Sequence, residues 1–306
     1  MQTQVYHDRI GYLPWTEPLE FSGGSLTPLE EYQEVAAWVE KNKHTDGFIY
    51  PPLTHSVHIT TKCLRKDEVD EADLEQITNS ERFALLHKIP ASHYLSIQTP
   101  VHSRSPREGD AAFIMHLAAY LFGVRLQFYN WWFDGRVPIQ STHNIYVRPS
   151  AANSFISTAY ATWKGFSTEH QKLITNLLFM NSRAPVYEWK WEQFAVNYMV
   201  FDGCYKLAKK VHSLPQTNHG DRLIAVCNFF GIPVDKTHLH EIVRLRNALF
   251  HETLWDNEQP CSAGSSVSWY EAANLRRLNQ RIIAALLGYR GDYINSNWLT
   301  LGICNF

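Results

Sequence analysis

Three polar residues within one short segment could together carry out acid–base chemistry on a phosphate. Arg246, Asn247 and His251 stand in the segment DKTHLHEIVRLRNALFHETLW, beside an apolar stripe made of Leu239, Ile242, Val243, Leu249 and Phe250. An α-helix turns by about 100° per residue, so Asn247 and His251 fall about 40° apart on one side of a helix. Arg246 lies on the flank nearer the apolar stripe. A guanidinium, an amide and an imidazole are therefore expected along one helix edge.

This combination of side chains suits the cleavage of a phosphodiester. Arginine keeps its charge at any relevant pH, and its planar donors match phosphate oxygens. Histidine titrates near neutrality, so it can take a proton from a ribose 2′-hydroxyl or give one to a leaving oxygen, which is worth about 10² to 10⁴ in rate. Asn247 could orient either partner, and no metal or other cofactor is required when arginine stabilises the developing charge. A solvated helix face carries the same residue types, so the three residues alone leave a structural role open.

The residues around this segment predict a run of amphipathic helices. Apolar residues recur at helical spacing in five consecutive segments, at 167–181, 187–212, 219–230, 235–252 and 268–288. Ser167 and Asp235 stand at helix-cap positions, and Ser268 with Glu271 makes a capping box for the last segment. Short breaks between long helices favour an antiparallel bundle.

The N-terminal half predicts a mixture of helices and strands. Thr27, Pro28 and Glu30 are typical of a helix start, and the helix is expected to end near Asp46 and Gly47. Further elements are expected as strands at 57–63 and 93–99, as a helix at 69–89, and as a hairpin turning at Asp134 and Gly135. The apolar segment 111–123 is expected as a buried helix, with a strand region as the alternative. The small, polar segment 148–154 marks a boundary. We therefore predict an α+β protein, with a mixed α/β domain at 1–155 and an all-α up-and-down helical bundle at 156–306.

The segment from Glu241 to Glu252 resembles the signature of HEPN domains (higher eukaryotes and prokaryotes nucleotide-binding). That signature is an arginine, four to six residues and then a histidine, with asparagine commonly following the arginine. In this chain four residues separate Arg246 from His251, and Asn247 follows the arginine. An apolar helix late in a helical bundle strengthens the match. The resemblance covers roughly residues 165–290.

The resemblance implies a four- or five-helix bundle that forms a homodimer. Many HEPN proteins are metal-independent ribonucleases of toxin–antitoxin, anti-phage and CRISPR-associated systems, in which motifs from two subunits meet in one cleft. Carried over to this chain, the family assigns phosphate binding to Arg246, proton transfer to His251 and positioning to Asn247. The expected activity is endonucleolytic cleavage of single-stranded RNA or tRNA loops by attack of the 2′-hydroxyl. An antitoxin or regulatory protein is an expected partner beside RNA.

Not every member of the family cleaves RNA, so an alternative function stays open. A HEPN-like module could bind RNA, a nucleotide or a protein partner without cleaving it. A metal-dependent hydrolase is a third hypothesis, because His238, His240 and His251 supply three imidazoles. A zinc site would need closer spacing or a carboxylate partner in place, and no metal site is predicted.

Other polar residues of the helical half are candidates to extend the site. A polar residue on the second helix often supports the motif in HEPN bundles, and the candidates here are Glu192, Asp202 and Lys206, each of which could equally belong to an ion-paired or solvated face. Basic residues of the helical half could line an RNA path, or could be ordinary polar faces; the RNA-binding candidates are Lys206, Lys209, Lys210, Arg276 and Arg277.

The N-terminal half contains aromatic residues but no motif of known chemistry. An aromatic run beside Arg136 could stack on bases or fill a core, and it comprises Tyr129, Trp131, Trp132 and Phe133. The half has no phosphate-binding glycine loop and no hydrolase motif. By analogy with two-part defence proteins, we expect it to sense a trigger or to regulate the helical half.

Composition limits the class of protein. Of the 306 residues, 45% are hydrophobic and 19% are charged, which is typical of a globular protein. The net charge of −2 excludes a global basic field, so any contact with RNA has to be local. The five cysteines are scattered without a CxxC pair, and there is neither an apolar leader nor a long apolar run. These features predict a cytoplasmic protein without a membrane span.

Overall fold

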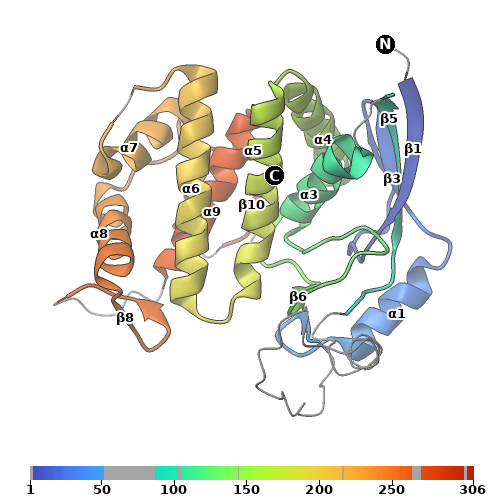
Figure 1. Cartoon of the computed structure of the whole chain (residues 1–306), viewed down its shortest axis with the longest axis horizontal. Coiled ribbons are helices and arrows are strands. Elements are labelled where there is room, and N and C mark those ends of the chain that lie inside the picture. The colour runs from blue at the N-terminus through green and yellow to red at the C-terminus, as the bar shows by residue number, and fades with distance from the viewer. Residues whose placement is uncertain are drawn as a thin grey trace, which may run out of the picture.

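The computed structural model describes residues 3–51, 87–101, 105–143, 145–215, 217–263, 270–299 and 302–306. It confirms the α+β fold class, and Figure 1 shows a sheet at one end of the molecule with helices filling the rest. The strand predicted at 57–63 and nearly all of the helix predicted at 69–89 lie outside the described residues. The last residues of that segment are not helical, because His87 pairs with Phe133 in an isolated bridge.

The sheet is antiparallel and lies at the N-terminal end of the molecule (Figure 1). Among the described residues it contains, in spatial order, β1 (Thr3–Ile10), β5 (His93–Pro100), β3 (Gly24–Pro28) and β2 (Leu19–Phe21). Strand β5 confirms the prediction at 93–99. Its side chains alternate between the two faces, so Leu95 and Ile97 are fully buried in the core.

The helix predicted to start at Thr27 begins further along the chain. Helix α1 spans Tyr32–Asn42, and Thr27 and Pro28 belong instead to β3, where they pair with β5. The local cap signal was therefore wrong, because ladder pairing with β5 decides the conformation of these residues.

The hairpin predicted at Asp134 and Gly135 is also not formed. The following strand, β6 (Val137–Pro138), pairs with the distant β4 (Phe48–Ile49). The Asp134 carboxylate accepts hydrogen bonds from Arg125 and Arg183, each at 2.7 Å, so long-range ion pairs hold this segment.

Helices make up most of the C-terminal half. They are α4 (Pro149–Lys164), α5 (Thr168–Arg183), α6 (Lys190–His212), α7 (His219–Phe230), α8 (Lys236–Glu252) and α9 (Glu271–Leu286). Helices α5 to α9 confirm the five predicted segments. Helix α4 was not predicted, and it begins inside the polar segment 148–154.

Two of the predicted helix caps are confirmed by hydrogen bonds. The Ser167 side chain accepts from the backbone N–H of His170, and the Asp235 side chain accepts from that of His238. The capping box predicted from Ser268 lies outside the described residues.

Short elements complete the described part of the chain. They are the 3-10 helices η3 (Pro106–Glu108) and η4 (Ala184–Val186), and the strand pairs β7 (Ile145–Tyr146) with β10 (Cys304–Asn305) and β8 (Trp255–Asp256) with β9 (Gln259–Pro260). None of the described helices is both long and apolar enough to cross a membrane.

Helix α3 (Asp110–Phe122) confirms the helix predicted at 111–123, and nearly all of its side chains are buried. It packs on α5, on α4 and on β5, so every side of it meets another element. Gly123 ends the helix in the left-handed conformation, with φ of 67°, which glycine adopts without strain. One hydrophobic core runs from Ile10 in the sheet to Phe306 near the C-terminus.

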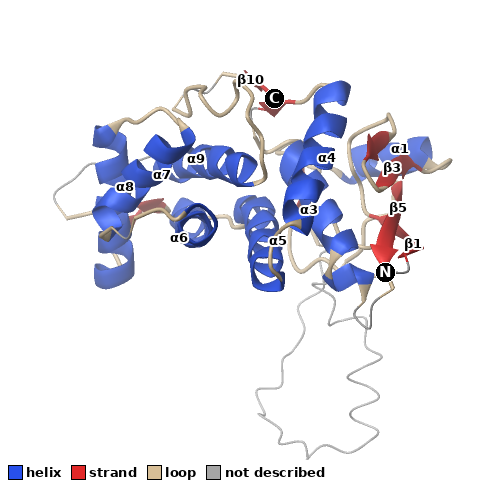
Figure 2. Cartoon of the chain, turned by 90° about the horizontal axis from the view of Figure 1, so that it is seen from above, coloured by secondary structure: helices blue, strands red, loops and turns tan. Residues whose placement is uncertain are grey.

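Helix α9 is the helix around which several others of the C-terminal half pack. Helix α9 packs against α6, α5 and α7, and α7 packs in turn on α8. Figures 1 and 2 both place α7 and α8 at the end of the molecule farthest from the sheet. The segment with the predicted site therefore lies on an outer helix.

Loss of the cap on α8 should destabilise the protein. Asp235 accepts from the His238 N–H at 3.1 Å, so Asp235→Ala should lower the free energy of unfolding by about 1 kcal/mol. Urea-induced unfolding measures this change. Lys236→Ala removes an exposed neighbour and should alter stability by less than about 0.5 kcal/mol. Equal losses in the two variants would contradict the role of the cap.

Candidate functional site

Helix α8 positions the three predicted residues along its edge. Its inner side buries Leu239, Ile242, Leu245 and Leu249, and these side chains fix the rotation of the helix. Phe250, which the sequence placed in the apolar stripe, is instead 45% exposed. Burial of the inner side leaves the polar edge of α8 facing outward.

The structure brings Arg246, Asn247 and His251 together as predicted. The Arg246 Nη1 donates to Asn247 Oδ1 at 3.0 Å and to His251 Nε2 at 2.8 Å. A guanidinium can only donate, so the lone pair of Nε2 points at Arg246. Asn247 and His251 are exposed, and no carboxylate of the described residues forms an ion pair with Arg246. Within the described part of the chain, the charge of this half-buried guanidinium is therefore not neutralised by an ion pair.

Aromatic rings hold the Arg246 guanidinium in place. Its central carbon lies 5.7 Å from the ring of Tyr198 on α6 and 5.5 Å from the ring of Phe250, within the range of cation–π contacts. Burial raises the pKa of Tyr198 to about 12, and Asp202 adds to the rise while Arg246 opposes it. The Tyr198 hydroxyl and the Arg246 Nε are both buried, and neither has a hydrogen-bond partner among the described residues.

Residues from α6 and α7 extend this polar cluster. The Arg222 Nη1 lies 3.1 Å from Asp202 Oδ1 and 3.1 Å from His219 Nδ1. Burial and the Arg222 charge lower the pKa of His219, Asp202 opposes them, and Arg246 and His251 lower it further. The α7 imidazole therefore lies within the electrostatic field of the α8 motif.

Sequence reasoning found only part of this cluster. Asp202 was one of three candidates on the second helix, whereas His219 and Arg222 were missed. The signal that could have found them is their spacing of three residues, which places both side chains on one face of the first turns of α7.

The other two candidates on α6 lie outside the cluster. Glu192 accepts from the backbone N–H of Trp189 at 3.3 Å and so caps the start of α6. Lys206 is exposed, and Lys210 pairs with Glu169 of α5 at 2.6 Å. Contact of Lys206, Lys209 and Lys210 with RNA stays a prediction.

The two arginines predicted to line an RNA path are partly buried and hydrogen-bonded to other parts of the chain. Arg276 donates to the backbone oxygen and to the hydroxyl of Thr142, at 2.6 and 2.8 Å. Burial lowers the pKa of Arg276 to about 10. Arg277 donates to the backbone oxygen of Trp298 at 2.7 Å. These bonds attach loops to the central helix α9, and they do not support the predicted contact with RNA.

The three imidazoles of the metal hypothesis have different surroundings. His238 Nδ1 lies 3.1 Å from Glu271 Oε1, His240 is exposed and His251 contacts Arg246. Across the described ranges, no group of three histidine, cysteine, aspartate or glutamate side chains could hold a metal ion.

The aromatic run of the N-terminal half divides between core and surface. Phe133 is 2% exposed, whereas Tyr129, Trp131 and Trp132 are exposed. Arg136 donates to the backbone oxygens of Val186, Pro185 and Tyr187, and so attaches this segment to the connection between α5 and α6. Core filling is therefore confirmed for Phe133, and stacking of the exposed rings on bases stays a prediction.

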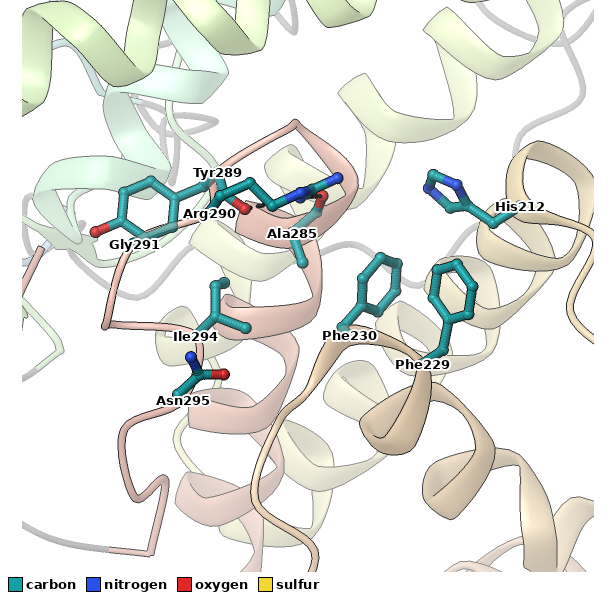
Figure 3. A pocket seen from close by; sticks show the side chains of 9 residues that line it. All are labelled: His212, Phe229, Phe230, Ala285, Tyr289, Arg290, Gly291, Ile294 and Asn295. Carbon is teal, nitrogen blue, oxygen red and sulfur yellow. Dashed lines mark hydrogen bonds between the residues drawn. The ribbon is translucent and has the colours of Figure 1, made fainter.

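A separate pocket lies where the ends of α6, α7 and α9 meet (Figure 3). His212, Phe229 and Phe230 face its opening from α6 and α7, and the Arg290 Nη1 donates to backbone oxygens of Ala285 and Tyr289. The phenylalanines are at the C-terminal end of α7, and His219 is at the other end, roughly 16 Å away by helix rise. The pocket is therefore distinct from the cluster around Arg246.

Comparisons of the chain with protein-family models, with curated proteins and with solved structures found no match.

Proposed function

We propose that this chain is a metal-independent endoribonuclease of the HEPN type, which cleaves single-stranded RNA or tRNA loops. The observation that carries the proposal is the contact between the Arg246 guanidinium and the His251 Nε2, on an exposed helix edge. The two groups needed for phosphodiester cleavage are in contact, and the exposure of His251 supports access of a phosphate to them. An RNA-binding module would need the arginine but gains nothing from an imidazole lone pair aimed at the phosphate site.

The reaction follows from this geometry. The non-bridging oxygens of a phosphodiester accept hydrogen bonds from Arg246. These bonds replace the contact between the guanidinium and His251. The freed Nε2 takes the proton of the ribose 2′-hydroxyl, whose oxygen bonds to phosphorus while the bond from phosphorus to the 5′-oxygen breaks. A second group returns a proton to the leaving oxygen. The products are a 2′,3′-cyclic phosphate and a 5′-hydroxyl, and Asn247 orients the guanidinium through its 3.0 Å contact.

A second copy of the chain is the partner that the resemblance implies. Phe250 and Trp255 are 45% and 40% exposed next to the site, and Trp255 stacks on Trp191 at 5.0 Å. Apolar surface of this kind beside a site is typical of contact surfaces between proteins. We therefore propose a homodimer through the helical half, and a cytoplasmic toxin or anti-phage effector controlled by an antitoxin or regulatory protein.

Purified protein should cleave single-stranded RNA in the presence of EDTA. The readout is a 5′-labelled RNA separated on a denaturing gel, with the new ends tested for a 2′,3′-cyclic phosphate. RNA that is bound but left intact would contradict cleavage and favour the binding module. Cleavage that appears only after Zn²⁺ or Mn²⁺ is added would contradict the metal-independent mechanism.

A further inference from the structure

The pocket between the ends of α6, α7 and α9 has the size and the lining of a site for a small molecule (Figure 3). Its volume of about 310 Å³ lies at the lower end of the range of about 300 to 1,000 Å³ that is typical of ligand pockets. We propose that this pocket binds a small aromatic carboxylic acid in its ionised form, with one ring or two fused rings. Binding at this pocket is independent of the proposed cleavage of RNA.

Aromatic side chains form one side of the pocket. The ring centres of Phe229 and Phe230 lie 4.9 Å apart, and the His212 ring lies 5.2 Å from the first and 5.6 Å from the second. Phe229 is 50% exposed, so much of its ring is left for a ligand to cover. The His212 Nε2 is buried without a hydrogen-bond partner among the described residues, so this ring serves as a wall rather than as part of a polar network. Three rings that meet in this way suit a planar aromatic ligand.

Arg290 provides a positive charge at the same pocket. Figure 3 shows its side chain extended from the end of α9 toward His212. The Arg290 Nη1 donates to the backbone oxygens of Ala285 and Tyr289, at 2.8 and 2.7 Å, and these bonds hold the guanidinium in place. Arg290 is exposed and forms no ion pair with the described residues, and its Nε and Nη2 form no hydrogen bond with them. Two parallel donors of this kind match the two oxygens of a carboxylate.

The other ionisable side chains of the pocket do not neutralise Arg290. None of the described residues that line the pocket is acidic. Burial and the Arg290 charge lower the pKa of His212, so its imidazole is neutral near pH 7. Burial and Asp292 raise the pKa of Tyr289, so its phenol also stays neutral. Asp292 itself is exposed and does not line the pocket, so a bound anion meets an arginine and no carboxylate there.

The position of the pocket favours a ligand with a single negative charge. His212 and Phe230 are the last residues of α6 and α7, and Ala285 lies in the last turn of α9. The backbone carbonyls at the C-terminal end of a helix carry a partial negative charge, which opposes a second charge on the ligand. One guanidinium in this setting therefore suits a carboxylate better than a phosphate dianion.

Isothermal titration calorimetry with matched probes tests the chemistry of the ligand. The purified chain should bind 2-naphthoate or benzoate in a saturable manner, and the amide of the same ring should bind about tenfold or more weakly, because it has the same shape without the charge. Absence of saturable binding of both acids would overturn the proposal. Equal binding of acid and amide would overturn the recognition of an anion, and tighter binding of phenyl phosphate than of benzoate would overturn the choice of a carboxylate.

Substitutions test whether the acid binds in this pocket. Arg290→Gln should weaken binding of the acid by about tenfold or more, and Arg290→Lys should weaken it less, because the charge is kept. Phe229→Ala should also weaken binding, because one aromatic wall is lost. Arg244→Gln removes a positive charge from the exposed side of α8 and should bind the acid as the wild type does.

Thermal unfolding of each variant confirms that it is folded before its affinity is compared. Wild-type affinity in folded Arg290→Gln and Phe229→Ala would place the acid elsewhere on the chain and would overturn the proposed site. A loss in Arg244→Gln as large as that in Arg290→Gln would also overturn it, since the total charge of the chain would then decide binding.

Discussion

His251→Ala should reduce cleavage of single-stranded RNA by about 10²- to 10⁴-fold, which is the range expected when a proton-transferring group is removed. The His251 side chain is exposed and contacts Arg246, so the fold should be unaffected by its removal. Initial rates on a labelled RNA at a fixed pH, with EDTA present, give the measurement.

A histidine on the same helix provides the control for this prediction. His240 is also exposed on α8, so His240→Ala removes an imidazole of similar exposure from a position outside the site. Cleavage by this variant should match the wild type. Comparable rates for His251→Ala and the wild type would show that His251 does not take part in the reaction.

Arg246→Ala should have the second large effect. Its guanidinium is the cation that would meet the phosphate, and loss of one such stabilising group costs about 10² to 10³ in rate. Because an arginine fork holds two phosphate oxygens at once, Arg246→Lys should restore only part of the activity. Growth of bacteria expressing each variant offers a second readout, since a toxic ribonuclease would lose its toxicity in Arg246→Ala.

Arg244 is the matched control, two positions before Arg246 on the same helix. It is bound to Glu241 at 2.6 Å and lies on the exposed side of α8. Arg244→Ala removes one positive charge from α8, as Arg246→Ala does, but leaves the site intact. Equal losses of activity in the two variants would show that the charge of the helix, rather than the position of Arg246, matters.

The helical half of the fold was predictable because its signal is local. Apolar residues at helical spacing locate α5 to α9. The hydroxyl of Ser167 and the carboxylate of Asp235 mark the N-terminal caps of α5 and α8. Helix α4 was missed because its first turn contains Pro149, Ser150 and two alanines, which are equally typical of a linker.

The N-terminal half depends on contacts between distant residues. Thr27 and Pro28 carry a helix-start signal but lie in a strand, because β5, some 65 positions later, is available for pairing. Asp134 and Gly135 carry a turn signal, and the Asp134 ion pairs with Arg125 and Arg183 replace the hairpin. Strand β5 lies far along the chain from Thr27, and Arg183 lies far from Asp134, so neither pairing can be predicted from neighbouring residues.

The candidate site divides in the same way. Arg246, Asn247 and His251 lie on one helix, so their grouping follows from the helical repeat alone. His219, Arg222 and Asp202 come from two further helices, and only packing of α6, α7 and α8 brings them near the motif. The spacing of His219 and Arg222 places them on one face of α7, but it does not indicate which helix that face meets.

Helix α3 has a consequence for how this molecule can evolve. Because its side chains pack at once on the sheet strand β5 and on α5, the same residues contribute to the stability of the sheet region and of the helices next to it. A substitution in α3 that suits one neighbour has to be accepted by the other. The sequence of the sheet region is therefore constrained to change together with that of α5, which packs on the other side of α3.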